Sequence, residues 1–255
     1  MDIPKDFKEP KNFLKELSSG GEDEWNERGE VRVLELFHAM TERVPAYSDF
    51  LKKNKIDSQK IKNHEDLRTV PTIDKDNYLR AYPLSELCWD GDFKNKRWTI
   101  STTSGSTGEP VYFPRHEGED LQYALVAEAY LRSNFNIDKK STLYINAFPM
   151  GAWIGGLFTH DAVRTIAERG GYSLSIISPG VHKLEVIKAI QKLGSSFDQV
   201  LIGSYGPFLK DILDDGEKLG VDWKQYNLGF IFSAESLSEG FRDYVTQHAG
   251  VKDVL

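Results

Sequence analysis

The fold class is decided by an alternation of patterns in residues 183–220, KLEVIKAIQKLGSSFDQVLIGSYGPFLKDILDDGEKLG. In Lys183–Leu193 apolar residues recur at helical spacing and lysines lie on the opposite side, which predicts an amphipathic helix. A short β-rich run follows at Gln199–Ile202, and a second helical pattern covers Phe208–Leu219. Helix, strand and helix in this order are typical of a parallel sheet covered by helices.

The same alternation continues over residues 96–255. The other predicted strands are Trp98–Thr102, Thr142–Ala147, Tyr172–Ile177 and Gly229–Phe232, and the other predicted helices are Asp120–Asn134, Leu157–Glu168 and Ser238–His248. We therefore predict an α/β fold class with a predominantly parallel sheet flanked by helices. Val251–Leu255 resembles the start of a further strand, so we expect the sequence to stop within a domain.

A helical lead-in is predicted for residues 1–95. From Glu30 to Asn54 apolar residues recur at helical spacing, and Pro45 interrupts them, which predicts two helices with a kink or break between them. A further helix is predicted at Asp74–Ala81, closed by Pro83. We expect this mostly helical segment to pack on the main domain.

The composition is that of an ordinary globular protein, with 40% hydrophobic and 28% charged residues among 255. No apolar stretch approaches the roughly 20 residues that a membrane span needs, and the charged start lacks the apolar core of a signal peptide. Because Cys88 is the single cysteine, no internal disulfide is possible. These features favour the cytoplasm and predict no membrane partner.

The net charge of −7 argues against nucleic acid as a partner, because 39 acidic residues outnumber 32 basic ones and no basic run offsets them. Nucleotides remain open, since backbone N–H groups and magnesium can hold phosphates locally. The six histidines show no paired spacing, so we predict no metal site formed by this chain alone.

A loop of glycines and hydroxyl residues, Thr103-Ser104-Gly105-Ser106-Thr107-Gly108, lies between two β-rich runs. Glycine permits positive φ angles and close approach to the backbone, so such a loop can turn its amides towards an anion. The hydroxyls add donors, each contributing about 1.5–3 kcal/mol when it binds a charged oxygen. The alternative is an ordinary polar turn, since the same residue types dominate turns in general.

Other glycine-rich motifs do not match. The chain has no G-x-x-x-x-G-K-[ST] P-loop and no G-x-G-x-x-G dinucleotide fingerprint. Gly203-Ser204-Tyr205-Gly206 is one residue short of the G-x-S-x-G nucleophile elbow. The sequence therefore supports neither a P-loop NTPase nor an α/β-hydrolase.

The segment from Thr103 to Pro110 resembles the phosphate loop S/T-S-G-T-T-G-x-P of the adenylate-forming superfamily, which comprises acyl-CoA synthetases, luciferases and peptide-synthetase adenylation domains. Upstream, Val33–Phe37, Val44–Tyr47 and Asp66–Lys75 resemble the lead-in of phenylacetate–CoA ligase-like proteins. The resemblance runs from about Val31 to the last residue. It implies the incomplete large N-terminal domain of an adenylate-forming enzyme.

The resemblance also implies three groups of site residues. The ATP phosphates would bind Thr103, Ser104, Gly105, Ser106, Thr107 and Gly108. The adenine would lie beside Ser233, Ala234 and Glu235. The acyl pocket would be built by Phe148, Trp153, Gly155, Gly156, Ser204 and Tyr205. Purely structural roles stay open as alternatives. Aromatic residues between strand and helix often belong to the core, and Glu235 suits a helix N-terminus. Residues 96–255 would then form a nucleotide- and acyl-binding domain.

The sequence departs from the family pattern in two respects. Glu109 stands where the ligases often have lysine. The family's Tyr-Gly-x-Thr-Glu segment, its ribose-binding aspartate and its C-terminal domain with the catalytic lysine would follow Leu255. The resemblance therefore assigns no catalytic residue and no magnesium ligand to this chain, which we expect to be inactive or very weak alone.

The implied activity is ATP-dependent activation of an aryl or other hydrophobic carboxylic acid to an acyl-adenylate, followed by transfer to coenzyme A, with magnesium as a cofactor. The alternatives are adenylyl or acyl transfer to another acceptor, and a paralogue that binds nucleotide or acid without turnover. The expected partner is a small-molecule carboxylic acid, and a homodimer stays open.

Overall fold

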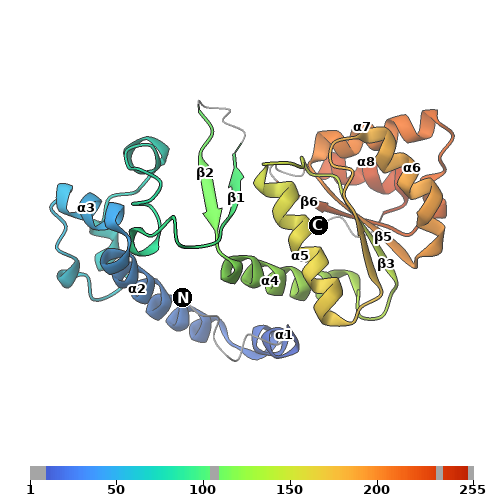
Figure 1. Ribbon diagram of the computed structural model, residues 1–255. Helices are drawn as coiled ribbons and strands as arrows, with labels where there is room; N and C mark the ends of the chain where they lie inside the picture. Colours follow the sequence, from blue (N-terminus) through green and yellow to red (C-terminus); the bar gives the residue numbers. More distant parts are fainter. Residues whose placement is uncertain (1–9, 104–108, 234–237, 252–255) are drawn as a thin grey trace. The chain divides into compact units, whose positions relative to one another are not determined.

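The computed structural model describes residues 10–103, 109–233 and 238–251 of the chain (Figure 1). The helices are α1 (Pro10–Ser19), α2 (Glu22–Arg43), α3 (Pro45–Lys53), α4 (Glu117–Phe135), α5 (Ile154–Gly170), α6 (Lys183–Leu193), α7 (Gly206–Lys218) and α8 (Glu239–Ala249). The strands are β1 (Thr99–Thr102), β2 (Tyr112–Arg115), β3 (Thr142–Asn146), β4 (Leu174–Ile177), β5 (Gln199–Ser204) and β6 (Leu228–Phe232). Short 3-10 turns lie at Ser58–Lys60, Asp66–Thr69, Trp89–Gly91, Gly194–Ser196 and Trp223–Gln225, and a π turn lies at Lys75–Leu79.

The described residues form two compact units. The α/β unit comprises residues 10–14, 99–103, 112–233 and 238–251 and contains all the strands above. The helical unit comprises residues 15–98 and 109–111.

A four-stranded parallel sheet with strand order β4-β3-β5-β6 is the centre of the α/β unit. The chain leaves β3 through α5 towards β4 on one side, and it leaves β5 through α7 towards β6 on the other side. The direction of the connections therefore reverses between the adjacent strands β3 and β5. In open parallel sheets, ligands bind beyond the carboxyl ends of the strands at such a point.

Helices cover both faces of this sheet (Figure 1). Because successive side chains of a strand point to opposite faces, each strand contributes to two cores. On one face Leu143, Val200 and Phe230 are buried in a core with α6, α7 and α8. On the other face Tyr144 and Leu201 are buried in a core with α4 and α5. The predicted α/β fold class, with a parallel sheet flanked by helices, is confirmed.

The strand predicted at Trp98–Thr102 forms as β1 but lies outside the parallel sheet. It pairs antiparallel with β2 in a separate two-stranded sheet, with Thr99 opposite Arg115. The reason is the short connection between them, because parallel strands need a crossover of a dozen or more residues. The main sheet is thus parallel, and β1 lies outside it.

The helical unit is held together by a core rich in aromatic residues. Tyr47 and Phe50 of α3 contact Tyr78, with ring centroids 6.2 and 5.7 Å from that of Tyr78. The break predicted at Pro45 is confirmed, since α2 ends at Arg43 and α3 begins at Pro45, where proline fits the first helical position.

The helix predicted at Asp74–Ala81 is wrong in length and type. Only a π turn, Lys75–Leu79, forms there. Asp74 caps it by accepting the N–H groups of Asp76 and Asn77, as the sequence suggested, but Pro83 leaves no room for an α-helix to extend. The strand predicted at Val251–Leu255 lies, apart from its first residue, outside the described residues.

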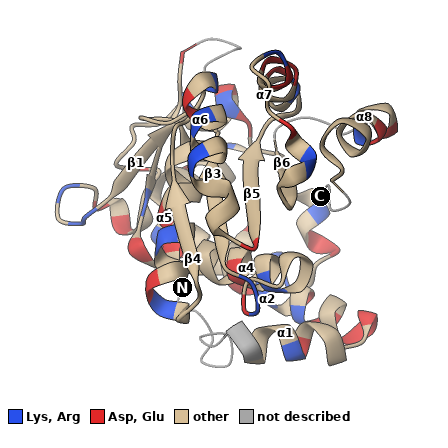
Figure 2. Ribbon diagram, turned by 90° about the vertical axis from the view of Figure 1, so that its right-hand side faces the viewer, with Lys and Arg blue, Asp and Glu red and all other residues tan. Residues whose placement is uncertain are grey.

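Charges of both signs are mixed on the helices that cover the sheet. In Figure 2, Lys and Arg lie beside Asp and Glu on α6 and α7. This mixture agrees with the absence of a basic run in the sequence. Within the described residues, no helix combines the length and apolar character needed to cross a membrane.

Candidate functional site

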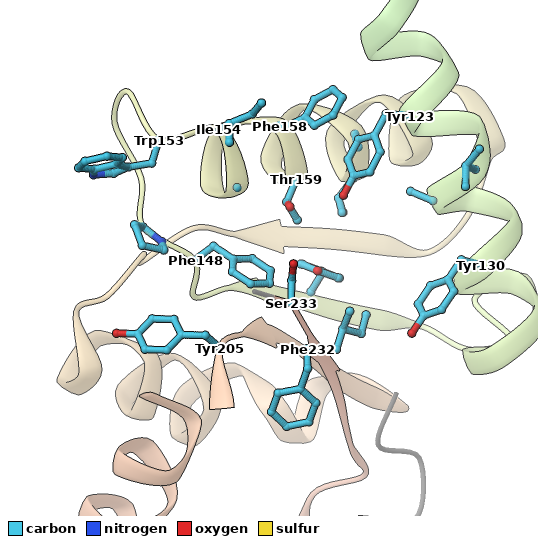
Figure 3. A pocket seen from close by; sticks show the side chains of 18 of the residues that line it. Tyr123, Tyr130, Phe148, Trp153, Ile154, Phe158, Thr159, Tyr205, Phe232 and Ser233 are labelled. Carbon is cyan, nitrogen blue, oxygen red and sulfur yellow. The ribbon is translucent and has the colours of Figure 1, made fainter. Parts of the chain in front are cut away.

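A cavity of about 970 Å³ lies in the α/β unit, between the helix pair α4–α5 and the sheet (Figure 3). Its volume is at the upper end of the range of about 300–1,000 Å³ that is usual for small-molecule sites. It is lined by Thr102, Thr103, Tyr123, Val126, Ala127, Tyr130, Leu131, Tyr144, Phe148, Pro149, Trp153, Ile154, Gly155, Phe158, Thr159, Ala162, Val163, Tyr205, Ile231, Phe232 and Ser233.

The cavity lies where the sheet topology favours a ligand. Phe148 follows β3, Tyr205 follows β5 and Ser233 follows β6, and all three line the cavity. The carboxyl ends of these parallel strands meet at one edge of the sheet, and the connections reverse between β3 and β5. The site therefore combines a large cavity with the topological switch point.

The side chains of the cavity wall are apolar except for hydroxyl groups and the indole N–H of Trp153. None of the residues that line it is Lys, Arg, His, Asp or Glu. The rings of Tyr123 on α4 and Phe158 on α5 stack with centroids 4.0 Å apart. The Arg115 guanidinium lies 4.3 Å from the centroid of Phe158 and bonds Asp120 at 2.8 Å. The stack and this cation–π contact hold the Phe158 ring in place.

Burial raises the pKa of two phenols of this wall. The Tyr144 side chain is 3% exposed, and burial raises the pKa of its hydroxyl far above the ordinary value, with smaller effects of Tyr123 and Tyr130. Burial also raises the pKa of Tyr130. Neutral phenols can donate and accept hydrogen bonds, so this wall suits an uncharged polar group.

The segment that leads into the predicted phosphate loop pairs with the chain beside the cavity. The Thr102 N–H donates to the Ala152 carbonyl at 2.8 Å, and Thr102 forms an isolated parallel bridge with Trp153. The next residue, Thr103, lines the cavity, and its buried Oγ1 has no hydrogen-bond partner in the described structure. The start of the loop and the cavity therefore form one continuous site.

The structure brings several of the residues predicted from the sequence together. Phe148, Trp153, Gly155 and Tyr205 from the predicted acyl pocket line the cavity, as do Thr103 from the predicted phosphate loop and Ser233 from the predicted adenine side. Ser104, Gly105, Ser106, Thr107 and Gly108 lie outside the described residues, as do Ala234 and Glu235. The ligands assigned to all of these residues stay predictions.

Gly156 and Ser204 do not line the cavity. The Gly156 carbonyl accepts a hydrogen bond of 2.8 Å from the Asn146 side chain, and a Cβ at position 156 would overlap the Pro149 carbonyl. Ser204 is fully buried, with its hydroxyl 3.5 Å from the Ala147 carbonyl oxygen. In this structure both residues hold the ends of β3, α5 and β5 together beneath the cavity.

Other lining residues were not predicted from the sequence. Tyr123, Ala127 and Tyr130 recur at helical spacing within the predicted helix Asp120–Asn134, where such a stripe predicts a core face. Tyr144 lies inside a predicted strand. The local pattern carries no signal that separates a residue of a cavity wall from one of a filled core.

A smaller cavity of about 440 Å³ adjoins Trp153. It lies beyond β4 and is lined by Pro149, Met150, Trp153, Ser178, Pro179, Gly180, Val181, His182 and Glu185. Nδ1 of His160 lies 2.8 Å from Oγ of Ser178, one of these lining residues. Across the part of the chain that the structure describes, no three His, Cys, Asp or Glu side chains gather as a metal site.

Comparison with solved structures finds proteins of similar fold. No protein-family model and none of the curated proteins matches the sequence. A crystal structure of 2-hydroxyisobutyryl-CoA ligase in an open conformation, in complex with 2-HIB-AMP and CoA, matches 88% of this chain and 50% of its own, at 16% identity and a TM-score of 0.69.

A second structure of that ligase, in the postadenylation state in complex with 2-HIB-AMP, matches 88% of this chain and 46% of its own at 18% identity and a TM-score of 0.68. The chain thus spans about half the length of the solved structures that it matches. Its fold is similar to that of about half of this ligase.

Proposed function

We propose that this chain binds ATP and a hydrophobic carboxylic acid as the N-terminal part of an ATP-dependent acid–CoA ligase. The observation that carries the proposal is the continuity between the start of the predicted phosphate loop at Thr103 and the apolar cavity beyond β3 and β5. An enzyme that joins an acid to a nucleotide needs the two sites side by side.

The nucleotide end of the site is assigned to the loop that begins at Thr103. Its glycines and hydroxyls suit an anion, and the buried Thr103 Oγ1 is a hydroxyl for which the described residues supply no partner. Magnesium would enter with the phosphates and reduce their charge.

The acid end of the site is assigned to the cavity. Its walls from α4, α5 and β3 are apolar, which suits an aryl or other hydrophobic acid. The acid carboxylate would attack the α-phosphate of ATP to form an acyl-adenylate and release pyrophosphate, and the thiol of coenzyme A would then displace AMP. The chain would contribute alignment of the two anions in the first step.

The proposal is tested first at the level of ATP binding, measured by calorimetry. Replacing both Ser106→Ala and Thr107→Ala should weaken ATP binding by at least about tenfold, because each lost hydrogen bond involves a charged oxygen. A matched control is the pair Ser195→Ala and Ser196→Ala, two exposed hydroxyls outside the site. Equal ATP affinity of both double variants and the original chain would show that the loop is an ordinary turn.

Turnover is tested by acid-dependent exchange of pyrophosphate into ATP. Because the chain spans about half the length of the solved structures that it matches, we expect weak exchange from these 255 residues alone and stronger exchange when a domain equivalent to the other half of those structures is added. ATP and acid binding without exchange in either case would favour a binding protein without turnover. Exchange without thioester formation would favour an acceptor other than coenzyme A.

A further inference from the structure

Four phenols line the cavity, and the described residues give none of their hydroxyls a hydrogen-bond partner; three of the four, Tyr123, Tyr130 and Tyr144, come from α4 and β3. Tyr123 and Tyr130 extend from α4 into the cavity (Figure 3), and Tyr144 reaches it from β3. The structure pairs none of these hydroxyls with another described side chain or carbonyl, although the Tyr144 side chain is 3% exposed. The Tyr144 side chain is buried and those of Tyr123 and Tyr130 are partly buried, and all three line the cavity, so a ligand group or water in the cavity would have to be the partner of these hydroxyls.

The packing makes room for the Tyr144 hydroxyl specifically. A Cβ at position 203 would overlap the Tyr144 oxygen and would lie 3.0 Å from the Phe148 ring. Glycine at position 203 of β5 therefore allows the phenol to lie across the sheet surface. A phenylalanine at position 144 would fill the same core without a polar atom, so the packing alone does not require a hydroxyl there.

The two phenols of α4 lie on the same side of that helix. Tyr123, Ala127 and Tyr130 recur at a spacing of four and three residues, and all three line the cavity. The small Ala127 between the two rings leaves open space in front of them. The polar atoms of this wall thus face a space large enough for a ligand group.

The absence of charged side chains among the lining residues limits which ligand group can lie next to the phenols. The residues lining the cavity include no acid and no base, so an ionised group on the ligand would be buried without a counter-charge next to the phenols. A neutral hydroxyl or carbonyl oxygen would satisfy the phenols, since they can donate and accept.

We propose that Tyr123, Tyr130 and Tyr144 select an acid whose apolar body carries an uncharged hydroxyl or carbonyl oxygen away from its carboxylate. The inference rests on the proposed function, because it assigns the cavity to the acid. It predicts discrimination against two kinds of analogue, the plain hydrocarbon acid and the acid with a second carboxylate.

The test measures binding of matched acids to the chain in the presence of ATP, by calorimetry. The probes are 3-phenylpropanoate with 3-(4-hydroxyphenyl)propanoate, phenylacetate with its 3- and 4-hydroxy derivatives, and hexanoate with 6-hydroxyhexanoate and hexanedioate. In at least one series we expect the neutral oxygenated acid to bind about tenfold more tightly than the hydrocarbon, and the diacid to bind more weakly than both.

The variants Tyr123→Phe, Tyr130→Phe and Tyr144→Phe keep the volume of the wall and remove one hydroxyl each. We expect at least one of them to abolish the preference for the oxygenated acid while the affinity for the hydrocarbon acid stays equal or rises. Tyr226→Phe, which changes a partly buried phenol outside the cavity, is the control and should leave the preference unchanged. The unmodified chain tests the preference by itself should a variant fail to fold.

The outcomes separate this inference from the proposed function. If acids bind with ATP but hydrocarbon and oxygenated members bind equally well, the selection by phenols is refuted and the proposed function stands. If no acid binds and ATP binding does not depend on the loop, the proposed function itself is refuted. A preference that survives in all three Tyr→Phe variants would also refute the role of the phenols.

Discussion

Glu128 of α4 and Arg169 of α5 form a salt bridge of 2.6 Å in which the Glu128 side chain is only 2% exposed. The second carboxylate oxygen of Glu128 accepts a hydrogen bond of 2.6 Å from the Tyr172 hydroxyl. Both helices form walls of the cavity. This buried carboxylate therefore joins the two helices on whose separation the site depends.

Glu128→Ala is expected to destabilise the chain by about 1–3 kcal/mol, because it leaves Tyr172 without its acceptor and removes the partner of Arg169, whose side chain is 35% exposed. The measurement is urea unfolding. The control is Glu168→Ala on α5, which breaks a salt bridge of the same length, 2.6 Å, between exposed side chains. That control should cost at most about 1 kcal/mol, and equal losses in the two variants would contradict the assignment.

Two adjacent glycines at the start of α5 should respond differently to alanine. Gly156→Ala should destabilise the fold by about 1–3 kcal/mol or more, because the added Cβ would overlap the Pro149 carbonyl, which belongs to the backbone. Gly155→Ala adds a Cβ with no atom within 4 Å and should be neutral or stabilising by up to about 1 kcal/mol. Thermal unfolding distinguishes them, and a tolerated Gly156→Ala would contradict the observed packing.

The ion pairs of Asp215 predict a pH dependence of stability. Lys183 of α6 and Lys218, the latter at 2.8 Å, lower the pKa of Asp215 from 3.8 to about 2. Since the unfolded chain then binds the proton more tightly than the folded one, the contribution is complete above the ordinary pKa and is lost as the pH falls towards 2.

The corresponding measurement is the difference in unfolding midpoint between the original chain and Asp215→Asn. This difference should be larger at pH 5 than at pH 2.5. Asp243→Asn on α8, at an exposed position for which the described residues provide no ion pair, is the control. A difference that stays constant over this pH range would show that Lys183 and Lys218 do not act through the charge of Asp215.

Filling the cavity should weaken binding of the acid and leave binding of the nucleotide unchanged. Ala127→Phe places a ring in the space between Tyr123 and Tyr130 and should weaken binding of every acid that the original chain binds by at least about tenfold. ATP affinity should stay the same. Gln122→Phe adds the same ring to an exposed position of α4 outside the cavity and should change neither affinity. Loss of ATP binding with Ala127→Phe would contradict separate acid and nucleotide ends.

Much of the fold could be predicted because periodicity is a local property. Lys183–Leu193 was predicted with the bounds that α6 has, and the strand at Gln199–Ile202 forms as β5, which extends to Ser204. Pairing was harder. β1 could not be assigned to its own two-stranded sheet from its sequence, because the partner of a strand depends on the path of the chain between them.

Most of the lining residues predicted from the sequence lie in loops, whereas Tyr123, Tyr130 and Tyr144, which were not predicted, lie in regular elements. Phe148, Trp153 and Tyr205 follow strands or precede a helix, at positions where a parallel sheet binds ligands. Tyr123 and Tyr144 occur in the middle of a helix and a strand. There an inward aromatic residue has the same pattern in a filled core as in a cavity wall.

By itself the sequence determined the fold class and the order of the main helices and strands after Asn95, and it predicted a loop suited to an anion, because each depends on residues close together in the chain. Only the tertiary structure decided that the space between α4, α5 and the sheet stays open and that three phenols face it without partners in the described residues. A cavity is a property of how distant side chains fill a common volume, and no stretch of sequence contains that volume.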